Sequence, residues 1–310
     1  MKYIFGPVPS RRLGFSLGVD TIPFKICTLD CIYCQLGRTR CKTVKREEYI
    51  PSSKILAELE EVLRSSNERR IDYITLSGSG EPTLNSKIGE IIREIKKITS
   101  IPVVVITNGT LLTDRALREE LISADVVIPS LDAATEETFE RVNRAPLSLK
   151  ISKIIEGMMK FRKMYEEELW LEVMLIEGVN ESEEELTALK TATDKIKPDK
   201  IQLNTPRRPP CEDWVKVVSS ERLSQIKEFF GDNCEIIAEF KGKVEKRCLR
   251  DVEDEILALI SRRPVTSRDI SSSLGLDVGE VIKYMENLKR GKKISSKIHN
   301  GKTYFRIIEI

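Results

Sequence analysis

Three cysteines lie within eight residues near the start of the chain. In the segment KICTLDCIYCQLG (residues 25–37), Cys27, Cys31 and Cys34 are separated by three and then by two residues, and Tyr33 directly precedes the last cysteine. Thiolates are the usual ligands of iron–sulfur clusters, and a [4Fe–4S] cluster commonly binds four of them. Three cysteines would therefore bind three irons and leave the fourth iron open to a small molecule.

A zinc site or a set of buried thiols would also account for three neighbouring cysteines. A structural zinc ion takes four closed ligands, usually in pairs spaced by two residues, and the only histidine, His299, lies near the C-terminus. Accidental clustering of ordinary buried thiols is a further alternative. The spacing favours the iron–sulfur cluster, because clustered cysteines in a reducing compartment more often bind metal or do redox chemistry.

Composition indicates a chain with a substantial core. The 310 residues are 40% hydrophobic and 32% charged, with a net charge of +2, which predicts one large domain and a small one and no overall affinity for polyanions. The N-terminal segment MKYIFGPVPSRRLG has no apolar signal region, and no apolar run reaches the roughly 18 residues of a membrane span. We therefore expect a soluble cytoplasmic protein with no membrane partner.

Short apolar strands alternate with amphipathic helices through most of the chain. The strands are predicted at residues 16–22, 71–77, 101–108, 124–133, 169–176 and 199–205, and helices at 52 onward, 88–98 and 182–196. This alternation predicts a parallel sheet with crossover helices. Six such units fit a partial (β/α)6 barrel or an open doubly wound sheet, and the pattern alone does not distinguish the two.

Polar and glycine-rich segments follow these strands repeatedly. They are the cysteine loop, GSGEPT, TNGT, SLDA, EGVN and LNTPRRPP. In both candidate folds the chemistry takes place on the loops after the carboxyl ends of the strands. The sequence therefore predicts an active site at this edge of the sheet.

A different pattern begins near residue 250. Three helices are predicted at residues 251–263, 266–276 and 277–291, followed by a hairpin over 292–310 with Asn300-Gly301 as its turn. This order resembles a winged-helix domain and predicts a division into residues 1–250 and 251–310. The third helix and the hairpin carry the basic residues Lys283, Lys289, Arg290, Lys292, Lys293, Lys297 and Lys302. Nucleic-acid binding and a protein or structural contact are equally compatible with them.

The segment CTLDCIYC resembles the Cys-x3-Cys-x-aromatic-Cys loop of the radical S-adenosylmethionine (radical SAM) superfamily. Its GGEP-like segment corresponds here to residues 78–82, its TNG segment to 107–109 and its SLD segment to 130–132. Together the similar segments cover roughly residues 1–240. The opening GPVPSRRLGFSLGVD is similar to a poorly characterised branch of iron–sulfur oxidoreductases that looks related to wybutosine-synthesis and nitrogenase-cofactor-assembly enzymes.

The resemblance implies a partial (β/α)6 barrel with a [4Fe–4S] cluster on Cys27, Cys31 and Cys34. It also implies that the amine and carboxylate of S-adenosylmethionine (SAM) bind the open iron. An electron from an external flavodoxin-like or ferredoxin-like donor would then cleave SAM to methionine and a 5′-deoxyadenosyl radical, which abstracts hydrogen from a substrate. This predicts an oxidoreductase or transferase. The alternative is an iron–sulfur regulator that senses redox state and binds DNA through the C-terminal domain.

The resemblance also assigns residues to SAM binding. Gly78 and Gly80 would let the backbone approach the methionine end closely, and Ser79 lies between them. Glu81 would support the SAM amine, or else cap the following helix.

Further candidates lie on the other strand-end loops. Tyr33 would lie near the adenine or pack the cysteine loop. Ser130 and Asp132 are candidates for the ribose hydroxyls or the methionine carboxylate, whereas Asn108 and Asn180 are weaker candidates because asparagine is common in turns.

Two arginine pairs are candidates for the substrate. Arg11 and Arg12 lie near the first strand, and Arg207 and Arg208 follow the sixth. Guanidinium groups suit phosphate and carboxylate, so the pairs favour an anionic substrate, RNA included; a salt bridge or a solvated surface would account for any single arginine. The remaining cysteines, Cys41, Cys211, Cys234 and Cys248, form no tight pair, and we expect ordinary thiols rather than a second cluster.

Overall fold

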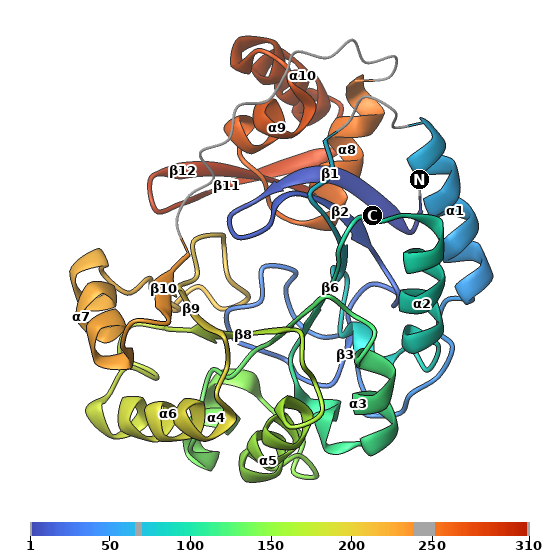
Figure 1. Ribbon diagram of the computed structural model, residues 1–310. Helices are drawn as coiled ribbons and strands as arrows, with labels where there is room; N and C mark the ends of the chain where they lie inside the picture. The colour runs from blue at the N-terminus through green and yellow to red at the C-terminus, as the bar shows by residue number, and fades with distance from the viewer. Residues whose placement is uncertain (1, 66–69, 238–251, 309–310) are drawn as a thin grey trace.

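A computed structural model describes residues 2–65, 70–237 and 252–308. In these ranges an eight-stranded sheet has the order β1-β2-β5-β6-β7-β8-β9-β10 and curves inside a layer of helices (Figure 1). Six of its strands run parallel to one another: β2 (Gly14–Val19), β5 (Tyr73–Leu76), β6 (Val103–Thr107), β7 (Val126–Pro129), β8 (Glu168–Met174) and β9 (Lys200–Asn204). They are the six predicted strands, and the expected partial barrel is confirmed.

The sheet has two strands that the pattern of six units does not include. β1 (Ile4–Ser10) pairs antiparallel with β2, and β10 (Cys234–Ile236) pairs parallel with β9. β1 contains Pro7 and Pro9, which lack the backbone N–H of a strand residue and so argue against a strand. They are tolerated because β1 is an edge strand with an irregular register between Phe5 and Val8.

Helices cover the outer side of the sheet. They are α1 (Ser52–Ser65), α2 (Ile88–Ile98), α3 (Arg115–Leu121), α4 (Glu136–Asn143), α5 (Ile151–Arg162), α6 (Glu183–Ile196) and α7 (Ser220–Phe230). The helices predicted to begin at Ser52 and to span 88–98 and 182–196 are confirmed. α6 shows how local sequence sets the bounds: Ser182 caps its first turn by accepting a hydrogen bond from the Glu185 N–H, and the helix ends where Lys197 adopts a left-handed conformation.

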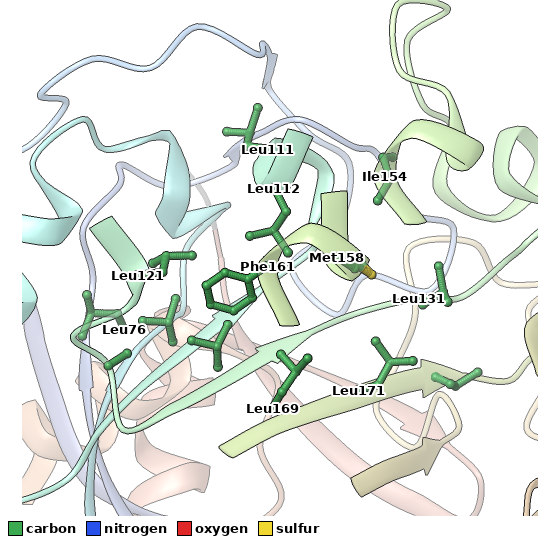
Figure 2. Close-up of a cluster of buried hydrophobic side chains, with 14 of the residues drawn as sticks. Leu76, Leu111, Leu112, Leu121, Leu131, Ile154, Met158, Phe161, Leu169 and Leu171 are labelled. Carbon is green, nitrogen blue, oxygen red and sulfur yellow. The ribbon is translucent and has the colours of Figure 1, made fainter. Parts of the chain in front are cut away.

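The main hydrophobic core lies between the sheet and these helices. Phe161 and Met158 of α5 face Leu169 and Leu171 of β8, and Leu76 of β5 and Leu121 of α3 pack nearby (Figure 2). Burial of each such side chain contributes about 1.5–3 kcal/mol. This apolar layer fixes the strands, and with them the loops at their carboxyl ends.

The C-terminal part consists of three helices and a hairpin, in the predicted order. They are α8 (Val252–Arg262), α9 (Ser267–Leu274), α10 (Val278–Arg290), β11 (Ile294–His299) and β12 (Lys302–Ile307). Asn300 and Gly301 both have positive φ, as a two-residue hairpin turn requires. That these elements form a winged-helix domain stays a prediction, and the predicted boundary between residues 250 and 251 lies outside the described residues.

The C-terminal elements pack against the first strand and against the loop after β9. Val8 of β1 shares a core with Ile256, Ile270 and Val281 of the three helices, and Phe5 packs against it. In the hairpin, the Tyr304 hydroxyl donates to the Arg207 carbonyl oxygen over 2.9 Å; Arg306 donates to the Pro209 carbonyl oxygen over 3.0 Å. The C-terminal part therefore closes one side of the barrel mouth. No helix of the described ranges has the length and apolar character needed to cross a membrane.

Candidate active site

A cavity of about 390 Å³ lies at the carboxyl ends of the strands. Most of the predicted site residues line it: Arg11, Arg12, Cys27, Cys31, Tyr33, Cys34, Gly78, Gly80, Glu81, Asn108, Ser130, Arg207 and Arg208. Three do not. Ser79 lines a neighbouring cavity, and Asp132 and the weaker candidate Asn180 are buried. The loops after different strands thus meet at one place, as the fold requires.

Each of the three clustered cysteines accepts a hydrogen bond from a nitrogen donor. Asn108 Nδ2 lies 3.6 Å from Cys27 Sγ, Asn143 Nδ2 lies 3.3 Å from Cys31 Sγ, and Lys25 Nζ lies 3.3 Å from Cys34 Sγ. Burial raises the pKa of Cys27 to about 12 and raises the pKa of Cys31 as well. Burial alone disfavours a thiolate, whereas these donors and a bound cation favour it. The three sulfurs are thus suited to ligate the irons of a cluster.

Lys25 holds its ammonium group inside the protein beside Cys34. Only 3% of the residue is exposed, and its backbone has a φ of +62°. The backbone N–H of Lys25 donates to the Ser79 carbonyl oxygen over 2.6 Å. The Lys25 carbonyl oxygen accepts from the backbone N–H groups of Arg40 and Cys41. These bonds hold a residue in an unfavourable conformation, and they direct a buried cation at the cysteines. An anionic cluster would compensate that charge.

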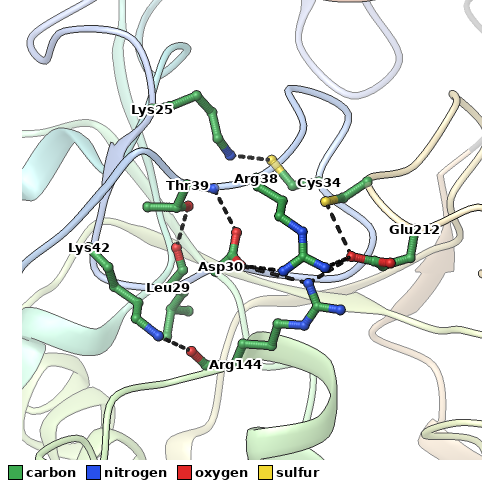
Figure 3. Close-up of polar contacts among 10 residues, drawn as sticks. Lys25, Leu29, Asp30, Cys34, Arg38, Thr39, Lys42, Arg144 and Glu212 are labelled. Atoms are coloured by element: carbon green, nitrogen blue, oxygen red, sulfur yellow. Dashed lines mark hydrogen bonds and ion pairs between the residues drawn. The ribbon is translucent and has the colours of Figure 1, made fainter.

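The rest of the cysteine loop is fixed by an ion network. Arg38 and Arg144 donate to Glu212 over 2.7 and 2.8 Å, and both lie 3.7 Å from Asp30 (Figure 3). The Thr39 N–H donates to the other oxygen of Asp30. These contacts join both ends of the loop to the helix-terminal residue Arg144 and to the loop after β9.

Gly80 allows the loop after β5 to contact the cysteine loop directly. A Cβ atom at Gly80 would overlap the carbonyl oxygen of Ile26, and one at Gly78, which has a φ of +123°, would overlap the Asp20 carboxylate. The N–H of Glu81 donates to that Ile26 carbonyl oxygen over 3.1 Å. The absence of side chains at Gly78 and Gly80 is therefore required for the packing of the two loops, whatever either glycine binds.

The Glu81 carboxylate joins the loops after β5 and β6. It accepts hydrogen bonds from the Thr83 N–H and hydroxyl, from the Thr107 hydroxyl over 2.6 Å and from the Asn108 N–H over 2.7 Å. Burial raises its pKa, and these hydrogen bonds oppose the rise. Glu81 also caps the short helix η1 (Pro82–Leu84). The capping role is thus observed, and a contact with the SAM amine stays a prediction.

The buried carboxylate of Asp132 is hydrogen-bonded to the cysteine loop through Tyr33. It accepts hydrogen bonds from the Tyr33 hydroxyl, from Asn143 Nδ2 over 2.8 Å and from the Met174 N–H over 3.0 Å. Burial raises its pKa to about 6. Because Asn143 also donates to Cys31, Asp132 positions a cysteine through one intermediate side chain. Asn180, the weaker candidate, donates to the carbonyl oxygens of Asp132 and Met174 and so has a loop-building role.

The lining of the cavity is also rich in arginine. Arg12 forms an ion pair with Glu172 over 2.9 Å, Arg11 donates to the amide oxygen of Asn204 over 3.2 Å, and Arg208 donates to that of Gln35 over 3.5 Å. Burial alone would raise the pKa of Glu172, but Arg12 outweighs this effect and the pKa is lowered.

Two more arginines, Arg262 and Arg263, reach the cavity from the end of α8. They are absent from the residues predicted for the site. Their one signal in the sequence is that they form an Arg-Arg pair, as do residues 11–12, 69–70 and 207–208.

Comparison with known families agrees with this geometry. The profile of the radical SAM superfamily matches residues 21–189, which include the cysteine loop and the four following strands. The chain belongs to the radical SAM superfamily. The predicted enzyme class and the predicted cofactors, a [4Fe–4S] cluster and SAM, are thereby confirmed for this chain.

Relatives of this radical SAM protein include several of the same length. A UPF0026 protein of Methanocaldococcus jannaschii is 34% identical over 96% of this chain and 100% of its own. A UPF0026 protein of Helicobacter pylori J99 is 35% identical over 96% and 95%. A Brachyspira hyodysenteriae protein named GTPase Obg is 39% identical over 97% of this chain, which spans only 44% of that relative.

Solved structures of other radical SAM proteins share the fold. A radical SAM methyltransferase from Sphaerobacter thermophilus superimposes with a TM-score of 0.57 at 17% identity, over 71% of this chain and 65% of its own. The hydrogenase maturase HydG from Carboxydothermus hydrogenoformans gives 0.51 at 15% identity, over 81% and 58%. At such identities the likeness concerns the fold alone.

The other cysteines of this radical SAM protein are dispersed. Cys41 is exposed, Cys234 is buried, and Cys211 contacts Glu212; Cys248 lies outside the described residues. Within residues 2–65, 70–237 and 252–308, no group of three or more His, Cys, Asp or Glu side chains is placed to hold a single metal ion.

Proposed function

We propose that Cys27, Cys31 and Cys34 bind the [4Fe–4S] cluster of this radical SAM enzyme, and that the enzyme removes a hydrogen atom from an anionic substrate. The observation that carries the proposal is the shared cavity: the three thiols and the arginines line the same space. When bound, the cluster and SAM supply the electron and the radical that the reaction needs.

The chain's own residues would prepare the site for these cofactors. Asn108, Asn143 and Lys25 stabilise anionic sulfur through their N–H groups. Gly78, Gly80 and Ser130 border the cavity with little side-chain bulk, which suits close approach of a ligand to the backbone. The Tyr33 ring borders the same space while its hydroxyl is held by Asp132. Buried walls would exclude water from a radical reaction.

The proposed substrate contacts are Arg11, Arg12, Arg207 and Arg208. All four line the cavity, and guanidinium groups bind phosphate or carboxylate oxygens with two parallel hydrogen bonds. Radical SAM enzymes need an external electron donor, and we propose a flavodoxin-like or ferredoxin-like protein. A cytoplasmic location and a nucleic-acid or protein partner for the C-terminal part stay predictions.

Anaerobic reconstitution tests the proposal. The full-length protein is loaded with iron and sulfide, mixed with SAM and reduced with dithionite; formation of 5′-deoxyadenosine is expected, and none is expected without dithionite. A cluster-loaded protein that leaves SAM intact but shifts specific promoter DNA in a gel would contradict the proposal and support the iron–sulfur regulator instead.

A further inference from the structure

We propose that Arg11, Arg207, Arg208 and Arg263 form one binding site for the polyphosphate group of a small substrate, with the C-terminal helices supplying one of its walls. This inference rests on the proposed function and narrows its substrate to a class. Arg263 belongs to no predicted site, and its place in the cavity assigns a role to the C-terminal part.

The four arginines come from three separate parts of the chain. Arg11 lies in the turn between β1 and β2, Arg207 and Arg208 lie in the loop after β9, and Arg263 directly follows α8. All four line the same cavity and are partly buried. Bringing four cations together in a partly buried space costs free energy unless an anion neutralises them.

Two other arginines that line the same cavity are neutralised by carboxylates. Arg12 is paired with Glu172, and Arg262 forms an ion pair with Asp20. By contrast, no carboxylate of the described residues forms an ion pair with any of the four clustered arginines.

The side-chain contacts of the four arginines are weak or missing. Arg11 and Arg208 contact only the neutral amides of Asn204 and Gln35, and the buried Nε of Arg208 has no hydrogen-bond partner among the described residues. Such a nitrogen is a donor that a ligand oxygen can satisfy.

Burial, and to a smaller extent mutual repulsion, lowers the pKa values of two of these arginines. Burial lowers the pKa of Arg11 to about 10, and Arg208 adds to the shift while Glu172 opposes it; burial lowers the pKa of Arg263 to about 9, again with Arg208 as the next contribution. Asp269 is the acidic neighbour that raises the pKa of Arg263, but it forms no ion pair with Arg263, and its Oδ2 accepts from the Thr266 N–H and hydroxyl at the start of α9. Among the described residues, the four arginines outnumber their two acidic neighbours, Asp269 and Glu172.

The hairpin of β11 and β12 contacts the loop after β9 that carries Arg207 and Arg208. The carbonyl oxygens of Pro206, Arg207 and Pro209 contact His299, Tyr304 and Arg306 at 3.2, 2.9 and 3.0 Å. These contacts fix the backbone of the loop and leave the guanidinium groups free to bind. A hairpin engaged in this way presents only part of its surface to other molecules.

The size and charge of the space favour a small phosphorylated molecule. Arg263 also borders the neighbouring cavity of about 890 Å³, and pockets for small ligands usually measure about 300–1,000 Å³. Four guanidinium groups offer more donors than one carboxylate or one phosphate can accept, so a diphosphate or triphosphate fits them best. The three cysteines line the same cavity, so the rest of the molecule would lie within reach of the radical.

Calorimetric titration of the reconstituted full-length protein tests this site. The probes are inorganic pyrophosphate, inorganic tripolyphosphate, citrate and a twelve-nucleotide oligouridine, at 0.15 M salt. We expect tripolyphosphate to bind most tightly. Arg263→Gln, Arg208→Gln and Arg11→Gln should each weaken it roughly 10- to 100-fold, and thermal unfolding establishes that each variant is folded. Arg290→Gln, on the exposed end of α10 outside the cavity, is the matched control and should bind like the wild type.

Three results would overturn the inference: no binding of either polyphosphate by the wild type, equal binding by wild type and Arg263→Gln, or preferred binding of oligouridine that Arg290→Gln weakens. The last result would favour RNA. Failure of the proposed function is separately visible. If the wild type binds tripolyphosphate but forms no 5′-deoxyadenosine, the anion site is supported and the proposed chemistry is contradicted. If it forms 5′-deoxyadenosine but binds no polyphosphate, the proposed chemistry is supported and the anion site is contradicted.

Discussion

Two parts of the cavity lining, a cysteine side (Cys27, Cys31 and Cys34 with their supporting residues) and an arginine side, differ in how their charged groups are neutralised. On the cysteine side, every thiol has a nitrogen donor, and the carboxylates of Glu81 and Asp132 accept several hydrogen bonds each from the chain. On the arginine side, the described residues leave four guanidinium groups without a carboxylate. The first side is complete except for its resident cofactors, whereas the second is complementary to a charge that the substrate must bring.

The largest effect is expected on the cysteine side. Changing Cys27, Cys31 or Cys34 to alanine removes one of the three ligands, so the cluster should be lost and 5′-deoxyadenosine should fall to background. Iron and sulfide content and the SAM cleavage assay measure this. Cys41→Ala, at an exposed position outside the cavity, is the control and should keep both. A normal iron content in all three variants would contradict the assignment of the cluster to this loop.

The paired arginine on the arginine side should matter most for stability. Arg12→Gln leaves the buried Glu172 without its ion-pair partner, which should lower the free energy of unfolding by about 3–5 kcal/mol at pH 7. In the wild type the lowered pKa of Glu172 means that its contribution is present above about pH 4.5 and is lost as the pH falls through its lower folded-state value.

The variant should therefore differ least from the wild type in acid. Urea unfolding at pH 7 and pH 4 measures both effects. A loss in Arg12→Gln that is the same at the two pH values would show that the ion pair is not its cause.

The carboxylate that joins the strand-end loops should have the next largest effect. Glu81→Gln replaces one acceptor oxygen by an N–H donor that would face the donors of Thr83, Thr107 or Asn108. We expect a loss of about 1.5–3 kcal/mol, seen as a lower urea midpoint with an unchanged slope. Glu119→Gln, on the exposed face of α3, is the control and should cost under about 1 kcal/mol. Equal urea midpoints for the two variants would show that Glu81 does not join the loops after β5 and β6.

The smallest effect should have the opposite sign. Arg11→Gln removes one of four clustered positive charges, so the ligand-free protein should become more stable by about 0.5–1 kcal/mol at low salt. The gain should shrink in 0.5 M sodium chloride and reverse in saturating tripolyphosphate. Comparison with Arg12→Gln, one residue away, tests directly whether Arg12 is neutralised and Arg11 is not. Equal losses of unfolding free energy in the two variants would show that the two arginines do not differ in this way.

Periodicity and the cysteine loop are sufficient to predict the parallel strands and the side of the sheet that carries the chemistry. β1 is missed because Pro7 and Pro9 argue against a strand unless the strand is known to lie at an edge. Lys25 and Asn143 are missed for another reason: a donor to a cysteine is defined by how the loops fold back, and nothing in the residues beside it records that contact.

The arginines show the same limit. The pairs at 11–12 and 207–208 are predictable because they lie directly before the first and directly after the last predicted strand, whereas Arg263 follows a helix near the far end of the chain. Only the packing of α8, α9 and α10 on β1 brings Arg263 to the cavity. Long-range packing of this kind has no local sequence signal.

The shared core of Phe5 and Val8 with the C-terminal helices has a consequence for biosynthesis. β1 pairs with β2 early, but it meets the C-terminal helices only after α8, α9 and α10 have been translated. The face of β1 that packs on these helices stays uncovered until then, so the wall of the cavity that carries Arg263 is the last to be completed.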